Sequence, residues 1–128
     1  MSKQILVIDD EPSIRRSFQL ALEDTGYQVD TAASGMEGLE MEKFNRYDLI
    51  CLDLKMPGLD GVDTLKELRK LDTGVPVYIV TAFYEEFFDR LDQALREGIE
   101  FEVLRKPISA DQIVLFVHSV LEGSNAGA

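Results

Sequence analysis

Residues 5–10 read Ile-Leu-Val-Ile-Asp-Asp, four aliphatic side chains followed at once by two carboxylates. A continuous apolar run of this length is typical of a strand that is buried on both faces of a parallel sheet. The pattern returns at residues 49–52 before Asp53 and at residues 77–80 before Thr81. Two runs that carry polar residues, at 27–29 and 101–104, predict strands at the edges of the same sheet.

The stretches between these runs carry apolar residues at helical spacing. Residues 14–22, 62–68, 87–95 and 113–121 each form an apolar stripe, and residues 35–44 predict a weaker helix because they contain two glycines. Ser109 suits the N-cap of the last helix, and Gly26 suits the end of the first. Because strand and helix alternate five times, we expect an α/β fold in which right-handed crossovers build one parallel sheet covered by helices on both faces.

Length and composition predict one domain with no affinity for nucleic acid or membrane. A chain of 128 residues suits a single domain, expected at residues 1–122, with a flexible tail or the start of a linker at 123–128. The net charge of −11 repels nucleic acid, and no apolar run approaches the ~20 residues of a membrane helix. The single cysteine, Cys51, lies in an apolar run, which indicates core packing in a reducing, cytoplasmic compartment.

Reactive side chains follow four of the predicted strands: Asp9 and Asp10, then Asp53, Thr81 and Lys106. Ligands of open α/β sheets bind outside the carboxyl ends of the strands, so these groups should converge on one rim. Three crowded carboxylates repel one another, and a divalent cation removes that penalty. An all-carboxylate set suits Mg²⁺, with Mn²⁺ possible. The alternative for Asp9 or Asp10 alone is to cap the helix that begins near residue 12.

These residues resemble, in type and in spacing, the signature of response regulator receiver domains of two-component signalling, the CheY-like superfamily: Asp9-Asp10, Asp53, Thr81-Ala82 and Lys106-Pro107. The loop at residues 52–61 is similar to the loop that follows the phosphoacceptor of that family. The resemblance covers residues 3–121. It implies a flavodoxin-like (βα)5 fold, a doubly wound five-stranded parallel sheet with strand order 2-1-3-4-5.

The resemblance also implies how the site would react. Asp53 would be the nucleophile that accepts a phosphoryl group from a histidine kinase or a histidine phosphotransfer protein. The Thr81 hydroxyl and the Lys106 ammonium would contact phosphoryl oxygens, and the Lys106–Pro107 peptide would be cis. Phosphoryl transfer needs in-line positioning and cancellation of charge more than covalent chemistry, which agrees with this set of groups.

Further roles in the family concern the metal and access of water. Asp10, Asp53 and the backbone carbonyl of Lys55 would bind the metal directly, and Asp9 would hold a metal-bound water. The side chains of Lys55 and Phe83, two positions after Asp53 and Thr81, would shield the phosphoryl group from attacking water and so set its lifetime.

The conformational switch departs from the family. An aromatic residue is expected three positions before the lysine, and Val103 stands there. Phe101 is either a substitute for that aromatic or an ordinary core or edge residue.

By the same likeness, output passes through the fourth helix, the fifth strand and the fifth helix, to a downstream target, an output domain or a second copy of the chain. Tyr84, Phe87 and Phe88 make this region rich in aromatic residues, and two of the three are expected in the core. A receiver of this kind is a signalling phosphoacceptor and not an enzyme acting on external substrates. The alternatives are a degenerate receiver that binds partners without phosphorylation and a small Mg²⁺-dependent phosphohydrolase.

Overall fold

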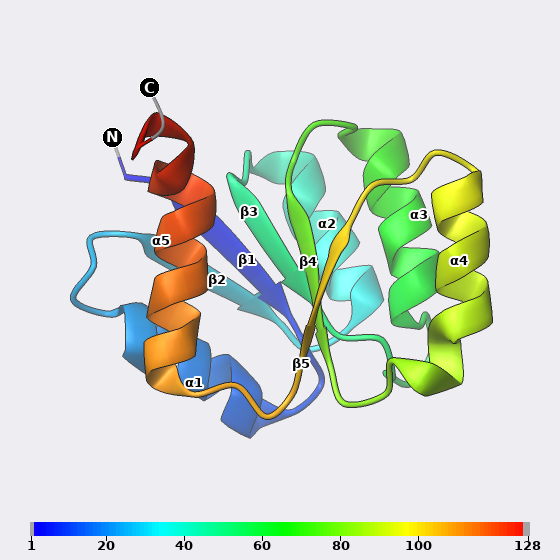
Figure 1. Cartoon of the computed structure of the whole chain (residues 1–128), viewed down its shortest axis with the longest axis horizontal. Helices are drawn as coiled ribbons and strands as arrows, with labels where there is room; N and C mark the ends of the chain where they lie inside the picture. Colours follow the sequence, from blue (N-terminus) through cyan, green and yellow to red (C-terminus); the bar gives the residue numbers. More distant parts are fainter. Residues whose placement is uncertain (1, 127–128) are drawn as a thin grey trace.

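Five parallel strands form one sheet in the order β2-β1-β3-β4-β5 in the computed structural model, which describes residues 2–126 (Figure 1). The strands are β1 (Gln4–Ile8), β2 (Gln28–Ala32), β3 (Leu49–Leu52), β4 (Val77–Thr81) and β5 (Glu102–Arg105). The helices are α1 (Pro12–Leu22), α2 (Gly35–Phe44), α3 (Gly61–Leu71), α4 (Phe88–Arg96) and α5 (Ala110–Ala126), with a short 3-10 turn η1 (Glu85–Phe87) before α4. The predicted flavodoxin-like α/β fold and its strand order are confirmed.

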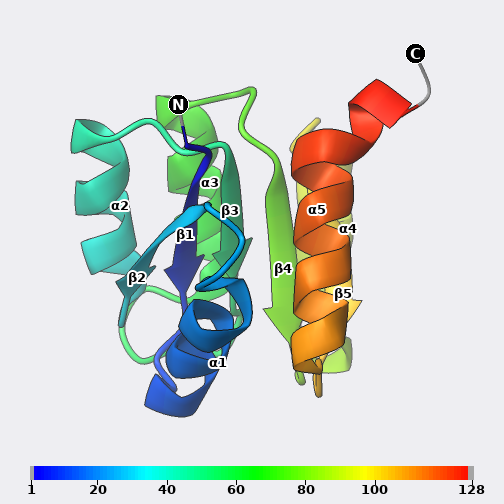
Figure 2. The same cartoon turned by 90° about the vertical axis from the view of Figure 1, so that its left-hand side faces the viewer.

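The helices cover both faces of the sheet, with α1 and α5 on one face and α2, α3 and α4 on the other (Figures 1 and 2). Successive strand residues point to opposite faces, so each strand serves two separate cores. In β1, Leu6 and Ile8 join the core beneath α2, α3 and α4, whereas Ile5 and Val7 join the core beneath α1 and α5. This double burial explains why the central strands are continuously apolar.

Most local expectations hold. The backbone N–H of Gln112 donates to the Ser109 hydroxyl at 3.2 Å and the Gln112 side chain accepts from the N–H of Ser109 at 2.8 Å, a reciprocal cap at the start of α5. Gly26 has a φ of +87°, a left-handed conformation that suits glycine after a helix. Cys51 is buried as predicted. The region at residues 35–44, the weakest of the helical predictions, is helix α2.

Two details differ from the sequence patterns. Leu95 was expected on the buried stripe of α4, but it is exposed, and the smaller Ala94 takes the buried position. Helix α5 continues to Ala126, so residues 123–126 extend the last helix past the predicted domain boundary, while residues 127–128 lie outside the described part. None of the described helices is both long enough and apolar enough to span a membrane.

A buried carboxyl group lies in α2, at the edge of the sheet away from the strand carboxyl ends. Glu42 is only 8% exposed, and its Oε2 atom has no hydrogen-bond partner among the described residues. Burial raises the pKa of this carboxyl group to about 7, the charge of Asp72 at the end of α3 adds to the increase, and Arg46 opposes it. The folded protein therefore holds a proton on Glu42 at a pH where the unfolded chain, with its ordinary pKa of 4.5, has lost it.

The substitution Glu42→Gln, which mimics the protonated carboxyl group, tests this assignment. Because the pKa is raised by folding, Glu42 imposes no penalty below pH 4.5, and stability falls as pH rises toward 7. We expect equal unfolding free energies for wild type and variant at pH 4.5, and a variant that is more stable by up to about 3 kcal/mol at pH 8, measured by urea unfolding. Glu40→Gln removes the same charge from the exposed face of α2 and is the control; equal gains for both variants at pH 8 would refute the assignment.

Candidate functional site

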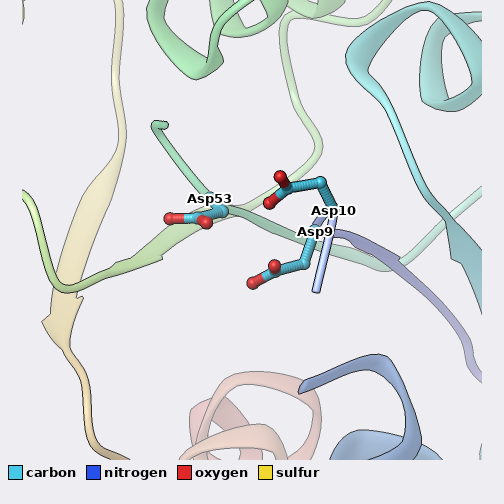
Figure 3. A group of neighbouring side chains, drawn as sticks. All are labelled: Asp9, Asp10 and Asp53. Carbon is cyan, nitrogen blue, oxygen red and sulfur yellow. The ribbon is translucent and has the colours of Figure 1, made fainter. Parts of the chain in front are cut away.

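The ends of β1 and β3 bring three carboxylates together. Ile8 pairs with Leu52 across the two strands, so Asp9 and Asp53 leave the sheet at the same level. The N–H of Asp53 donates to the carbonyl of Ile8 at 2.9 Å, which fixes the start of its loop. One carboxylate oxygen from each of Asp9, Asp10 and Asp53 lies within 4.8 Å of the others, and Figure 3 shows the three side chains next to one another. The structure thus brings the predicted acidic set into one cluster.

Lys106, which follows the edge strand β5, supplies the positive charge of this cluster. Its Nζ donates to Asp9 Oδ2 at 2.9 Å, to Glu11 Oε1 at 3.1 Å and to Asp53 Oδ2 at 3.4 Å. The side chains of Lys106, Asp9 and Asp53 are only 8%, 3% and 2% exposed. One buried ammonium group therefore balances two buried carboxylates and one at the surface.

The pKa shifts follow from this unequal balance. Burial raises the pKa of the Asp9 carboxyl group, and the neighbouring charge of Asp53 adds to the increase, although hydrogen bonds from the Glu11 N–H and from Lys106 oppose it. Burial alone would lower the pKa of Lys106, but the hydrogen bond to Asp9 and the charges of Asp53 and Asp9 raise it above its ordinary value. Lys106 is held firmly in its charged form. Its single positive charge compensates only part of the negative charge of the three carboxylates that it contacts.

The alternative assignment, that Asp9 or Asp10 caps α1, is wrong, because the N-cap residue is Glu11; Asp9 instead orders the turn that precedes the helix. Its Oδ1 accepts a hydrogen bond from the N–H of Glu11 at 2.9 Å, at the start of α1, while Oδ2 faces Lys106. Glu11, the N-cap residue of α1, makes no capping bond with its side chain. Asp9 thus orders the turn into α1 and contributes to the cluster at the same time.

Gly61, at the start of α3, allows the chain to pass directly against the backbone of Asp53 and Leu54. A Cβ atom on Gly61 would lie 2.2 Å from the carbonyl oxygen of Asp53, and the Gly61 N–H donates to the Leu54 carbonyl at 2.8 Å. Asp53 Oδ1 accepts from the N–H of Leu54 at 2.8 Å, which orients the carboxylate. Any side chain at position 61 would force the backbone that carries Asp53 to move.

Thr81 lies at the end of β4, fully buried beside the cluster's lysine. The N–H of Lys106 donates to the Thr81 carbonyl at 2.9 Å, and the Thr81 hydroxyl accepts from the N–H of Phe83 at 3.0 Å. Lys55 and Phe83, the two predicted shielding residues, contact each other, with the Lys55 Nζ 4.6 Å from the centroid of the Phe83 ring. Lys55 also pairs with Glu86 at 3.4 Å.

The residues around β5 fall into two groups. The Lys106–Pro107 peptide is cis, as expected. Val103 pairs with Ile79 and packs, half-buried, on the core beneath α4. Phe101 precedes β5 and packs on the same core at the amino end of the strand, whereas Thr81 pairs with Arg105 at the carboxyl end. This placement agrees with an ordinary half-buried residue at the border of the core.

Three residues of the site carried no role in the sequence analysis. Glu11 follows the acid pair directly, and its position at the strand end was the available signal. Gly61 stood inside the quoted loop, but only the observed approach of its Cα to the Asp53 backbone gives it a purpose. Arg105 precedes the key lysine, and its contacts with Tyr84 and Glu85 depend on a loop whose course a local pattern does not predict.

Comparison with known proteins places the chain in a family. The protein-family model described as "Response regulator receiver domain" matches residues 5–118 of the chain. The chain is 38% identical over 131 residues to the alkaline phosphatase synthesis transcriptional regulatory protein PhoP of Bacillus subtilis, covering 100% of this chain and 52% of that protein. It is 34% identical over 113 residues to sporulation initiation phosphotransferase F of the same organism, covering 88% and 89%.

A solved structure gives the same result. A CheY-like response regulator receiver domain protein from Methanospirillum hungatei superposes with a TM-score of 0.86 at 26% identity, covering 100% of both chains. The chain therefore belongs to the response regulator receiver domain family of two-component systems, in which the phosphoacceptor role is general. Receiver domains of this family interact with histidine kinases and output domains. The chain spans about half the length of PhoP and about a quarter of the transcriptional regulatory protein GlrR of Escherichia coli.

The charge balance at Lys106 yields a stability prediction. Lys106→Met leaves Asp9 and Asp53 buried without their counter-charge, so we expect the unfolding free energy to fall by about 3 kcal/mol in metal-free buffer at pH 7. The same substitution in an Asp53→Asn background should cost clearly less, because one buried charge is already gone. Urea unfolding of the four proteins of this cycle measures the difference.

Lys55→Met is the matched control. Lys55 is half exposed and pairs with a single exposed carboxylate, so its loss should cost less than about 1 kcal/mol. Equal losses for the two lysines would show that Lys106 has no special electrostatic role.

Proposed function

We propose that the chain is a phosphoacceptor that receives a phosphoryl group on Asp53 from a histidine kinase or a histidine phosphotransfer protein. The observation that carries the proposal is the convergence of Asp53 with Asp9, Asp10 and Lys106 within reach of one small volume. Family membership supports the reaction class, and the geometry supports the assignment to these residues.

In the proposed reaction an oxygen of the Asp53 carboxylate attacks phosphorus as the bond to the donor breaks. With a phosphohistidine donor the breaking bond is P–N, and the imidazole nitrogen keeps the electron pair. Lys106 already donates to Asp53 and Asp9, so it can exchange a carboxylate for a phosphoryl oxygen without moving far. Thr81, at the end of the adjacent strand, supplies a hydroxyl donor for another oxygen.

The acidic cluster fits Mg²⁺, with Mn²⁺ possible. Its ligands are hard carboxylate oxygens that lie close enough to share one ion. We assign direct contacts to Asp10, Asp53 and the backbone carbonyl of Lys55, and a water-mediated contact to Asp9. The bound ion would neutralise charge that develops on the transferred group.

The mouth of the site supports a role for Lys55 and Phe83 in the lifetime of the acyl phosphate. The lysine lies over the phenylalanine ring, so together they cover one approach to the segment between Thr81 and Glu86. Hydrolysis requires water to reach phosphorus in line. Contact between the two side chains would restrict that path.

The surface formed by α4, β5 and α5 is the proposed output face, which receives a downstream target, an output domain or a second copy of the chain. Phe88 on α4 and Leu115 on α5 are 47% and 69% exposed, while Tyr84 and Phe87 pack on the core. A hollow of about 440 Å³ between β5 and α5 is lined largely by apolar side chains, including Leu104 and Phe116. Apolar surface of this kind suits a protein partner. Direct nucleic-acid binding is not proposed, and the cytoplasmic location stays a prediction.

Acetyl phosphate with Mg²⁺ tests the phosphoacceptor assignment. We expect the intact mass to rise by one phosphoryl group in wild type and to stay unchanged in Asp53→Asn, because the nucleophile is absent. Asp48→Asn removes a half-buried carboxylate at the amino end of β3, where it accepts from the N–H of Gln4 at 2.8 Å, and this variant should be labelled as wild type. A folded wild type that gains no mass would favour the phosphorylation-independent receiver, and steady release of phosphate from external esters would favour the phosphohydrolase.

Thermal unfolding tests the metal assignment. Millimolar Mg²⁺ should raise the midpoint of wild type, because the ion binds the folded state and relieves repulsion among the three acids. The effect should shrink as pH falls, since the raised pKa of Asp9 lets protons compete with the metal. Asp10→Asn should lose most of the response, whereas Asp30→Asn, in the middle of β2, should retain it. Equal responses in the two variants would contradict the assignment.

A further inference from the structure

Two cations contact the segment that follows β4, at residues 82–87. One comes from the end of β3 and the other from the end of β5, the strands on either side of β4. The Lys55 Nζ, after β3, lies 4.6 Å from the Phe83 ring centroid and 3.4 Å from Glu86 Oε1. The Arg105 guanidinium, at the end of β5, lies 4.7 Å from the Tyr84 ring centroid and pairs with Glu85. Each cation therefore holds one aromatic ring and one carboxylate of the same short segment.

The grip by Arg105 is linked through the backbone to the proposed reaction site. Arg105 pairs with Thr81 across the β4–β5 ladder, and the next residue, Lys106, donates its N–H to the Thr81 carbonyl at 2.9 Å. The Thr81 hydroxyl in turn accepts from the N–H of Phe83 at 3.0 Å. The side chain of Arg105 thus reaches past Thr81 to hold the residues that immediately follow it.

The segment has space into which it can move. A small hollow of about 80 Å³ lies beside it and is lined by Thr81, Ala82, Tyr84, Glu85, Arg105 and Lys106. This space exceeds the volume of one water molecule, so the segment can shift toward the site without displacing a core side chain. Tyr84 and Arg105 both border the space and contact each other there.

A phosphoryl group on Asp53 would act unequally on the two cations. Lys55 follows Asp53 by two residues, so the added negative charge competes with Glu86 for its ammonium group. Arg105 directs its side chain to the exposed Glu85 and, among the described residues, makes no ion pair or hydrogen bond with Asp9, Asp10 or Asp53. Its hold on the segment should therefore persist and oppose movement toward the phosphoryl group.

We propose that Arg105 is a positioning residue for the Asp53 reaction: by gripping Tyr84 and Glu85 it holds the segment after Thr81 in an outer position and so restrains its closure over a phosphorylated Asp53. The proposal rests on the proposed function of Asp53. Arg105 makes no ion pair with Asp9, Asp10 or Asp53 in the described part of the chain, and its effect passes through the position of Thr81.

The test is the rate of phosphorylation by acetyl phosphate at saturating Mg²⁺, followed by intact mass. Arg105→Gln removes both contacts and should raise the maximal rate about two- to fivefold, as expected for loss of a weak surface pair and a cation–π contact. Arg105→Lys and Tyr84→Phe keep a cation and a ring and should stay near wild type, whereas Tyr84→Leu should resemble Arg105→Gln. The donor KM and the Mg²⁺ Kd, measured by calorimetry without donor, should not change.

Arg96→Gln is the matched control, because it removes the same charge from an exposed pair with Asp92 at the other end of α4. A merely structural role of Arg105 would lower the melting temperature without raising the rate. The proposal is overturned if Arg105→Gln reacts no faster than wild type, or if Arg96→Gln accelerates the reaction equally. A wild type that is not labelled at all overturns the function of Asp53, and this proposal with it; a labelled wild type with an unaccelerated Arg105→Gln overturns the positioning role alone.

Discussion

A single buried ammonium group determines how the charged end of this sheet is organised. Lys106 joins the end of β5 to carboxylates at the ends of β1 and β3, although β4 lies between β5 and β3. One positive charge does not neutralise Asp9, Glu11 and Asp53 together, and the remaining negative charge is what makes the site attractive to a divalent cation. The ion pairs of Lys106 thus leave part of the negative charge unbalanced, and on the proposed function a divalent cation would balance it.

The rigidity of the scaffold makes that balance possible. Strand residues alternate between two cores, so the backbone of β1 and β3 is fixed from both faces up to the residue before each aspartate. Beyond that point Gly61 lets α3 begin directly against the Asp53 backbone. Carboxylates that repel one another remain close because the elements that carry them have no freedom to separate. The cost of crowding is met by packing elsewhere in the domain.

The parts that could be predicted from the sequence are those with a local signature. Continuous apolar runs gave the central strands, and because parallel strands end at one edge, the polar residues after them gave the site. Contacts between distant loops have no such signature: the pairing of Lys55 with Phe83 and the grip of Arg105 on Tyr84 arise only once the strands are side by side. Glu42 is a further case that a local pattern does not predict. A glutamate on a helix is expected at the surface, whereas tertiary packing buries this one.

The contacts on the two sides of the site differ in strength. This difference indicates where a phosphorylation signal would leave the site. Arg15 donates to the Asp9 carbonyl at 2.8 Å and Asp9 orders the first turn of α1, so the β1 side is bound by buried or half-buried contacts. The segment before α4 is bound instead by exposed cations on exposed carboxylates, contacts that are individually weak. The Lys55–Glu86 pair is the first of these to change when charge is added at Asp53, because Lys55 follows Asp53 by two residues. On the proposed function, phosphorylation of Asp53 therefore leaves α1 in place and shifts the segment that leads into Phe88 and α4. A partner that responds to phosphorylation without contacting Asp53 would bind where α4 and β5 meet, because the contacts that hold this surface are weak enough to change.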